Sequence, residues 1–208
     1  MIIAPPSPRG PLYEWHLNAA AQFGLVDGWP VALRYPPREP QPESNMLMDL
    51  SHWPAWELGG RETERALQEL CGGTVPLRQI RPLDSGYVCR LTPSRALVFG
   101  KLPGPIWGAL DVTGGWSAVV LAGPDRERIL SKITSVDLRD TTLPALSCCQ
   151  GPIFGVNTLF CRFPDRFELH VCPDSLQFFW DVLLDAGQEF GLQPAGLESY
   201  HRLRGTSE

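Results

Sequence analysis

The sequence predicts an α+β protein in which two related strand–helix halves pack together. Three observations support this class: four segments with helical apolar spacing, short β-like runs between them, and one strand–turn–helix pattern that occurs twice. The 208 residues are 43% hydrophobic and 20% charged, which is ordinary for a packed chain. A chain of this length forms one large domain or two small, closely packed halves.

Four segments combine an apolar stripe with helix start and stop signals. In Asp174–Ala186, apolar residues recur every three or four positions, Asp174 can cap the start and Gly187 can end the helix. Proline or glycine marks both ends of two of the other three segments and the start of the third. These three are Leu12–Gln22, Arg61–Leu70 and Pro124–Ile133.

Short apolar runs between these helices are expected to be strands. They are Leu47–Leu50, Ala55–Leu58, Gly86–Leu91, Ala96–Phe99, Ser117–Leu121, Ile153–Cys161 and Phe167–Val171. Two longer stretches, Asp49–Leu70 and Asp111–Ile133, align with one inserted residue. Each begins with an aspartate, continues as a predicted strand, turns at a small residue followed by glycine, and ends in a predicted helix. Two copies are too few for a solenoid, so we expect a duplicated strand–helix unit whose sheets pack together.

A Pro-rich segment, Tyr35–Glu43 (YPPREPQPE), separates the N-terminal region from the body of the chain. Its composition favours an extended connector. We therefore expect an N-terminal arm and connector over residues 1–46 and a main domain over residues 47–208.

Charge and hydropathy exclude several classes of partner. The net charge of −5 and the pI of about 5.4 argue against binding to nucleic acid or anionic lipid. No window has the roughly 18 uninterrupted apolar residues of a membrane span. Pro5, Pro6 and Pro8 also interrupt the region where a signal peptide has its apolar core. We expect a cytoplasmic protein with no membrane partner.

Cysteine and histidine patterns predict neither a metal site nor a hydrolase. The six cysteines contain no CxxC pair, and the adjacent Cys148 and Cys149 are poorly placed to bind one zinc ion. We expect reduced thiols that pack in the core. None of the four histidines lies in a nucleophile elbow, and no GxGxxG motif follows a strand.

Several motifs, in order along the chain, resemble those of one family. Pro11–Tyr35 begins PLYEWH, Asp49-Leu50-Ser51-His52 is close to DVSH, Phe167-Glu168-Leu169 matches the end of GEDGFEL, and Gly191–Arg204 (GLQPAGLESYHRLR) is close to GLKPAGLGARDTLR. Together they resemble the glycine-cleavage T-protein, an aminomethyltransferase, over almost the whole chain. The second half is also similar to the γ subunit of heterotetrameric sarcosine oxidase. The resemblance implies the T-protein folate-binding fold without the β domain that ends a full T-protein.

The sequence departs from the family where the family carries its chemistry. Leu91–Lys101 (LTPSRALVFGK) stands in place of a longer N-x-x-GG-x-x-DD hairpin and has neither acidic residue of that pair. In the family, an aspartate there orients or deprotonates the folate nitrogen that attacks the aminomethyl donor, so we expect no methylene transfer by that route. Pro164 replaces the first Glu of GEDGFEL, with Asp165 beside it, and Tyr200-His201 replaces the Arg-Asp of the closing motif.

The resemblance implies six candidate folate-binding residues and no catalytic residue. Tetrahydrofolate is the expected cofactor. For His52, an equally simple role is to hold the turn by hydrogen bonds. For Trp53, the choice is between stacking on a pteridine and packing in the core. The candidates are Asp49, Ser51, His52, Trp53, Asp165 and Tyr200.

The function that follows is a T-protein-like, tetrahydrofolate-binding module of one-carbon metabolism with little or no transferase activity. The alternative is a non-catalytic γ-type subunit of a sarcosine-oxidase-like flavoenzyme complex. An active transferase with relocated acid–base groups is the third hypothesis. The expected partners are folate and larger flavoenzyme or folate-enzyme subunits.

Overall fold

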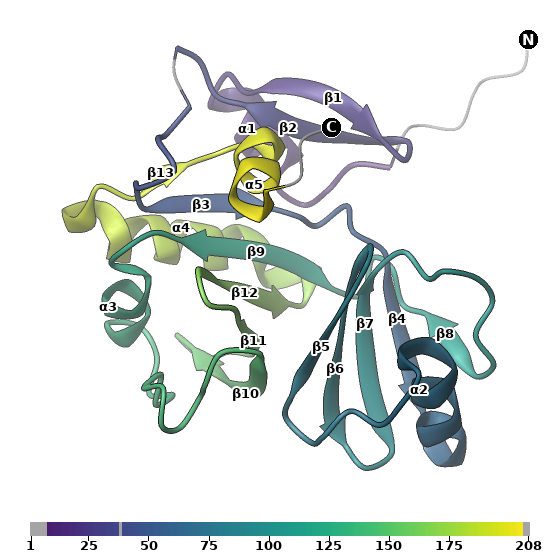
Figure 1. Cartoon of the computed structure of the whole chain (residues 1–208). Coiled ribbons are helices and arrows are strands. Elements are labelled where there is room, and N and C mark those ends of the chain that lie inside the picture. Colours follow the sequence, from purple (N-terminus) through teal and green to yellow (C-terminus); the bar gives the residue numbers. More distant parts are fainter. Residues whose placement is uncertain (1–7, 38, 206–208) are drawn as a thin grey trace, which may run out of the picture.

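Two β-sheets organise the chain, and a short hairpin lies above them (Figure 1). The computed structural model describes residues 8–37 and 39–205; residues 1–7, 38 and 206–208, which fall within the predicted arm, connector and C-terminal end, lie outside the described residues. One sheet has the spatial order β10 (Ser147–Ile153), β11 (Val156–Arg162), β12 (Arg166–Val171), β9 (Ser117–Ala122), β3 (Met46–Asp49) and β13 (Gln193–Pro194). Its strands pair antiparallel except β13 and β3.

The second sheet is antiparallel throughout and has five strands. Its order is β5 (Ile80–Leu83), β6 (Gly86–Thr92), β7 (Arg95–Gly100), β4 (Ala55–Gly59) and β8 (Ala109–Asp111). The separate hairpin consists of β1 (Gln22–Val26) and β2 (Trp29–Arg34).

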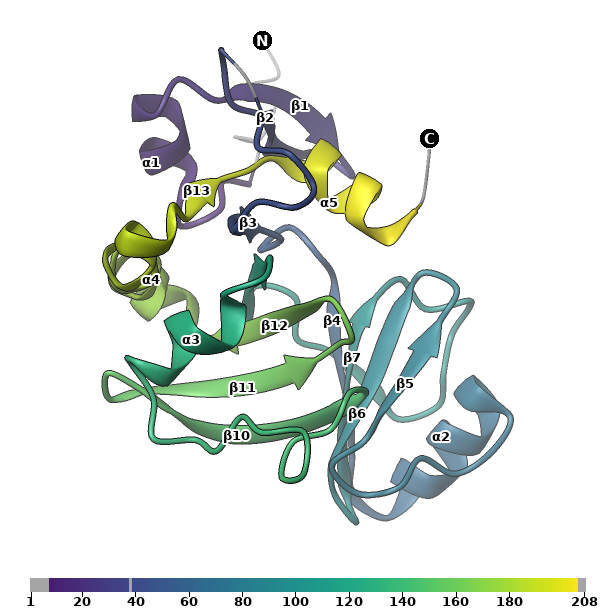
Figure 2. The ribbon, with the colours of Figure 1, turned by 60° about the vertical axis from the view of Figure 1, so that its left-hand side comes forward.

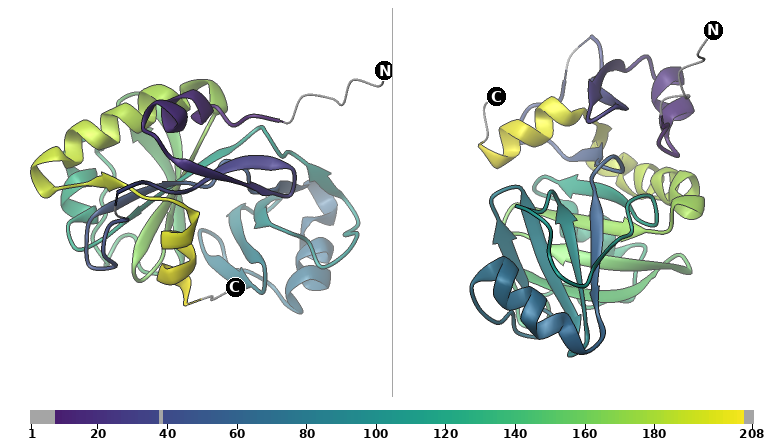
Figure 3. Two further views of the ribbon diagram at one scale, coloured as in Figure 1. Left: turned by 90° about the horizontal axis from the view of Figure 1, so that it is seen from above. Right: turned by 90° about the vertical axis from the view of Figure 1, so that its right-hand side faces the viewer.

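Five α-helices among the described residues cover these sheets. They are α1 (Tyr13–Asn18), α2 (Thr63–Cys71), α3 (Arg126–Ser131), α4 (Leu176–Gly187) and α5 (Leu197–Arg204). Helices α3 and α4 contact each other on one face of the six-stranded sheet, whereas α5 lies on its other face, between β3 and β2 (Figure 2). Helix α2 packs on the outer face of the five-stranded sheet (Figure 3). None of the helices among the described residues is long and apolar enough to cross a membrane.

The six-stranded sheet is buried on both faces, which explains the unbroken apolar run of β9. Val119 and Leu121 point toward α4, where they pack in one cluster with Trp180. Val120 and Ala122 point the other way and pack in a second cluster that includes Tyr200 of α5. A strand covered on both sides carries apolar residues at every position rather than at every second one.

The five-stranded sheet packs one face against the six-stranded sheet and the other against α2. Tyr87, Cys89 and Phe99 lie in a cluster with Leu159 and Cys161 of β11. The alternate residues Val88 and Val98 form a different cluster with Leu67 of α2. Each sheet also contains one copy of the duplicated pattern, because β4 is followed by α2 and β9 is followed by α3.

The N-terminal segment departs from the sequence prediction. We expected a helix over Leu12–Gln22, but α1 ends at Asn18 and Gln22 begins β1. The reason is the turn formed by Asp27 (φ 50°) and Gly28 (φ 84°), an Asp-Gly pair that favours a two-residue β-hairpin. The expected strand Ile153–Cys161 is likewise interrupted by Phe154 and Gly155, which join β10 to β11 with positive φ angles.

The Pro-rich connector is anchored to the C-terminal helix by one carboxylate. Glu39 Oε2 accepts hydrogen bonds from the backbone N–H of Gly196 at 3.1 Å and from Ser199 Oγ at 2.5 Å. Gly196 is the residue that precedes α5, so the Glu39 side chain satisfies a helix N-terminal donor that would otherwise lack an intrahelical partner. The sequence predicted neither α5 nor this contact.

Candidate ligand-binding site

A buried hydrogen-bond network joins α1 to the end of β3. Asp49 Oδ2 lies 3.0 Å from His16 Nε2, and Asp49 Oδ1 accepts from Ser51 Oγ at 2.5 Å and from the Ser51 backbone N–H at 2.8 Å. The Tyr35 hydroxyl lies 2.5 Å from His16 Nδ1. Because a carboxylate only accepts hydrogen bonds, Nε2 of His16 carries a proton and donates it to Asp49.

The electrostatics of this network favour a charged Asp49. Burial raises the pKa of the Asp49 carboxyl, but the hydrogen bonds from His16 and Ser51 outweigh burial, so its pKa lies below the usual value. Burial raises the pKa of Tyr35, helped by the negative charges of Asp49 and Glu39, so its hydroxyl stays protonated. In a catalytic Ser-His-Asp set the serine hydroxyl bonds the histidine, whereas Ser51 bonds the aspartate. The network is therefore an anchor between segments.

Beside this network lies a cavity of about 200 Å³. Its walls come from five parts of the chain: the β1–β2 turn, the segment between β3 and β4, the β5–β6 turn, the end of β7, and α5. The residues that give it chemical character are Asp27, His52, Trp53, Lys101, Leu197 and His201.

His52 and Trp53 form the inner wall of the cavity. His52 is buried, and this burial lowers its pKa to about 4, so it is a neutral hydrogen-bonding ring at physiological pH. The Trp53 ring contacts the Tyr200 ring edge-on, with 5.5 Å between centroids. Trp53 thus packs against the core and lines the cavity at once, so the two roles considered for it in the sequence are both compatible with its position.

Lys101 and Asp27 lie at the open side of the cavity. Lys101 Nζ donates to Asp27 Oδ1 at 2.8 Å, and the two side chains are 61% and 52% exposed. Asp27 is the only carboxylate among the described residues that line this cavity. Within the described chain, no cluster of three or more His, Cys, Asp or Glu side chains is arranged to hold a metal ion.

Tyr200 contacts Trp53 and belongs to a polar cluster centred on the fully buried Glu168. Its hydroxyl donates to Glu168 Oε1 at 3.0 Å, and Arg166 Nε donates to the same oxygen at 2.7 Å. Glu168 Oε2 has no hydrogen-bond partner in the part of the chain that the structure describes. Arg166 also binds Asp165, with 2.9 Å between Nη1 and Oδ1. Asp165 and Tyr200 are therefore held by this cluster and do not line the cavity.

The six predicted site residues accordingly fall into three places. His52 and Trp53 line the cavity, Asp49 and Ser51 belong to the adjacent network, and Tyr200 and Asp165 bond to the buried cluster. Sequence reasoning missed Asp27, Lys101 and His201 as cavity residues. The available signals were the Asp-Gly turn and the fact that Lys101 is one of only two lysines.

The fold and the sequence both match known proteins. Residues 107–206 match the family described as the GCVT N-terminal domain. An aminomethyltransferase from Desulfitobacterium hafniense (strain DSM 10664 / DCB-2) is 26% identical over 231 residues, covering 94% of this chain and 63% of that protein. The chain is similar in sequence to aminomethyltransferases over most of its length.

Two solved structures share the fold of this chain. The glycine cleavage system aminomethyltransferase T from Bartonella henselae superposes with a TM-score of 0.76 at 19% identity, over 95% of this chain and 62% of that one. A chain of the heterotetrameric sarcosine oxidase from Corynebacterium sp. U-96 superposes with a TM-score of 0.65 at 16% identity, over 88% of this chain and 96% of that one. The predicted α+β class and the resemblance to both groups are confirmed.

The chain spans less than two thirds of the aminomethyltransferases it matches. It spans 63% of the Desulfitobacterium protein and 62% of the Bartonella chain. Within the shared region, the β6–β7 hairpin turns at Pro93 and Ser94. No Asp or Glu occurs between Leu91 and Lys101. The charged side chain that lines the cavity at the end of this hairpin is therefore a lysine, Lys101, and not a carboxylate.

Proposed function

We propose that the protein is a tetrahydrofolate-binding module of one-carbon metabolism with little or no transferase activity. The observation that carries the proposal is the cavity beside Trp53 and His52, which the DLSH segment and its following tryptophan build in a T-protein-like fold. An indole and a neutral imidazole suit a flat, polar bicyclic ring such as a pteridine, because one offers an aromatic surface and the other a hydrogen bond.

The size of the cavity limits which part of the ligand it holds. Drug-sized ligands occupy roughly 300–1,000 Å³, whereas this cavity measures about 200 Å³. The space suits the ring system of a folate, and the remainder of the ligand would extend past the open side next to Lys101.

The low transferase activity follows from the acid–base groups at the cavity. General base catalysis needs a group within hydrogen-bond reach of the proton it removes. The one lining carboxylate, Asp27, is bound by Lys101, and the hairpin that carries the family's acidic pair has none. Glu168 is fully buried behind Trp53 and Tyr200, so it is shielded from a ligand in the cavity.

A titration with 5-formyltetrahydrofolate tests the proposal. We expect saturable binding by calorimetry, together with quenching of tryptophan fluorescence, and a large loss of affinity in Trp53→Leu and His52→Ala. Trp107→Leu is the matched control, because Trp107 is 66% exposed and does not line this cavity. The absence of binding by the folded wild-type protein would reject the proposal.

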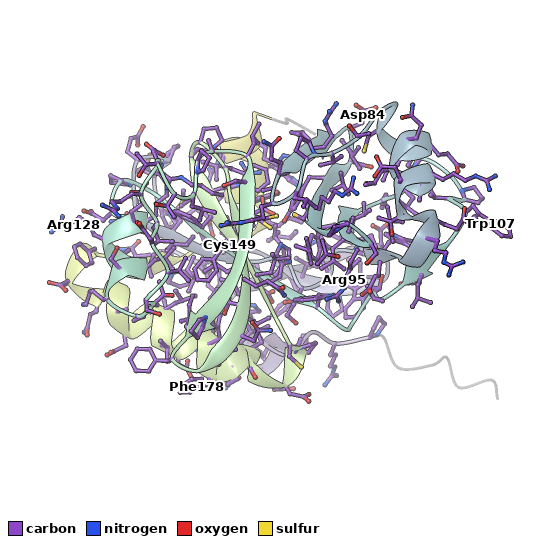
Figure 4. The ribbon with its side chains drawn as sticks, turned by 90° about the horizontal axis from the view of Figure 1, so that it is seen from below. Asp84, Arg95, Trp107, Arg128, Cys149 and Phe178 are labelled. Atoms are coloured by element: carbon purple, nitrogen blue, oxygen red, sulfur yellow. The ribbon has the colours of Figure 1, made fainter. Side chains whose placement is uncertain are left out.

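A second candidate is the non-catalytic γ-type subunit of a sarcosine-oxidase-like flavoenzyme. The observation that favours it is the match to a sarcosine oxidase chain of similar length, of which 96% is covered. The surface offers anchors for a partner: Trp107 and Leu110 are 66% and 64% exposed, and Trp107 projects from the half that contains the five-stranded sheet (Figure 4).

Purification from the native host tests this candidate. Co-elution with a flavin-absorbing complex at a fixed stoichiometry, weakened by Trp107→Ser, would support the subunit function. Recovery of the protein alone at native expression, with tight folate binding, would favour the first candidate.

A further inference from the structure

Three buried thiols meet in the space between the two sheets. Cys89 comes from β6 of the five-stranded sheet, and Cys148 and Cys161 come from β10 and β11 of the six-stranded sheet. All three lie in the cluster that packs the sheets together, and each is at most 1% exposed. Cys89 Sγ lies 3.3 Å from Cys161 Sγ, and 72 positions separate these residues in the sequence. All three are free thiols.

Cys89 is the central thiol, and the three differ in acidity. Burial raises the pKa of Cys89 well above its ordinary value, and hydrogen bonds to Cys148 and Cys161 add to this effect. Burial also raises the pKa of Cys161. The pKa of Cys148 is instead lowered, because Cys89 donates a hydrogen bond to it and the positive charge of Arg78 favours its thiolate. Since the thiolate is the reactive form, Cys148 reacts first.

Cys148 also lies closest to a route from solvent. It belongs to β10, the edge strand of its sheet, at a point where β10 contacts β6 (Figure 2). An exposed strip of chain, residues 76–79, covers it, and the Cys148 backbone N–H donates to the Arg78 carbonyl oxygen at 2.8 Å. Arg78 has a φ of 62°, which is unfavourable for a residue with a side chain. Local opening of this strip admits a small oxidant to Cys148.

We propose that Cys148, Cys89 and Cys161 form a peroxide-sensitive thiol relay that ends in a disulfide between Cys89 and Cys161 and locks the two sheets together. The Cys148 thiolate attacks hydrogen peroxide, becomes a sulfenic acid and releases hydroxide, which solvent protonates. The Cys89 thiol then attacks the Cys148 sulfur, and the sulfenic oxygen leaves as water.

The last step moves the disulfide to the buried pair. Cys161 attacks the Cys89 sulfur, the bond to Cys148 breaks, and the proton of Cys161 passes to the released Cys148. In the whole sequence two thiols lose two electrons to one peroxide, which becomes two water molecules. The exchange favours Cys89–Cys161 because the more acidic thiol, Cys148, is the better leaving group. The two sulfurs must approach by about 1.3 Å to reach disulfide bond length.

Peroxide treatment followed by peptide mapping tests the relay in the full-length wild-type protein. After treatment, the remaining thiols are alkylated in denaturant, and cleavage after aromatic residues separates Cys161 from Cys148, because Phe154 and Phe160 lie between them. We expect Cys89 joined to Cys161 and Cys148 recovered as an alkylated thiol. The midpoint of thermal unfolding should rise by roughly 5–10 °C and return to its starting value after reduction with dithiothreitol.

Single substitutions separate the steps. Cys148→Ala should slow the formation of the Cys89–Cys161 bond by at least about tenfold, because the reactive thiol is missing. Cys161→Ala should stop the sequence at a Cys89–Cys148 disulfide. The matched control is Cys149→Ala, since Cys149 is the next residue of β10 but packs against the cluster on the other face of the sheet. It should react at the wild-type rate.

Two outcomes overturn the relay, and neither bears on folate binding, on which the relay does not depend. The first is the absence of the Cys89–Cys161 bond in wild-type protein at a peroxide dose that converts the exposed Cys172 to a sulfenic acid, trapped with dimedone. The second is formation of the bond in Cys148→Ala as fast as in Cys149→Ala.

Discussion

His16 and Asp49 are hydrogen-bonded at 3.0 Å between Nε2 and Oδ2, although 33 residues separate them in the sequence. The two residues belong to the two motifs, PLYEWH and DLSH, that carry the resemblance to T-proteins in the first half of the chain. Their bond fixes α1 on the end of β3, directly beside the segment that supplies His52 and Trp53 to the cavity. The motifs thus position the segment that forms the inner wall of the cavity.

Removing Asp49 should destabilise the fold. Asp49→Ala leaves the buried His16 Nε2–H and the Ser51 hydroxyl without their acceptor, so we expect a loss of about 2–3 kcal/mol in the free energy of unfolding. Urea denaturation with a common m-value measures it. Asp111→Ala is the control, since Asp111 holds the corresponding place in the second strand–helix unit but is exposed, and should change stability by less than about 1 kcal/mol. Equal effects of the two substitutions would contradict the anchoring role.

Stability should fall in mild acid because of two buried histidines. Burial lowers the pKa of His52 to about 4 and that of His170 to about 3. Between the unfolded value near 6.5 and these folded values, the unfolded chain binds more protons, so stability is fully present above about pH 6.5 and is lost as the pH falls. Each histidine contributes a slope of about 1.4 kcal/mol per pH unit in that window.

Chemical denaturation between pH 7 and pH 4 measures this slope in the wild-type protein and in His52→Gln. We expect the variant to show a shallower dependence, whatever its stability at pH 7. Asp49 does not interfere, because its lowered pKa moves its own loss of stability to more acidic pH. An unchanged slope in His52→Gln would show that His52 is accessible to protons in the folded state.

Replacing the turn glycine should destabilise the protein more in the second strand–helix unit, at Gly123, than in the first, at Gly60. A Cβ at Gly123 would lie 2.6 Å from both the Cα of Asn45 and the carbonyl oxygen of Ser44, and its φ is +115°. Gly60 has a φ of +77° but open space around it. We expect Gly123→Ala to lose more than about 2 kcal/mol, through overpacking and backbone strain together, and Gly60→Ala about 1 kcal/mol. Thermal melts of both variants measure the two losses, and an equal or larger loss of stability in Gly60→Ala would contradict the prediction.

The missing acidic pair predicts no methylene transfer above background when the protein receives tetrahydrofolate and an aminomethyl-loaded lipoyl carrier. If a rate were found, Asp27→Asn should abolish it, because Asp27 is the carboxylate that lines the cavity. Asp165→Asn is the control, since Asp165 bonds to Arg166 away from the cavity. A rate that survives Asp27→Asn and disappears in Asp165→Asn would reject this assignment of the site.

The sequence by itself determined the elements whose local pattern is unambiguous. Helix α4 was predicted because its apolar stripe repeats with the helical period and its ends carry stop signals, and β9 because its apolar run is short and bounded by turns. The resemblance also gave the fold and brought His52 and Trp53 to attention. These features follow from periodicity and local backbone preference, which a linear sequence displays directly.

Only the tertiary structure decided the shape of the site. The ion pair between Asp27 and Lys101 joins residues 74 positions apart, and His201 comes from a helix that the sequence pattern did not predict. The bond between His16 and Asp49 and the burial of Glu168 behind Tyr200 likewise depend on how strands pair and layers pack. Local propensity carries no information about such contacts, because their free energy is realised only when distant segments exclude water between them.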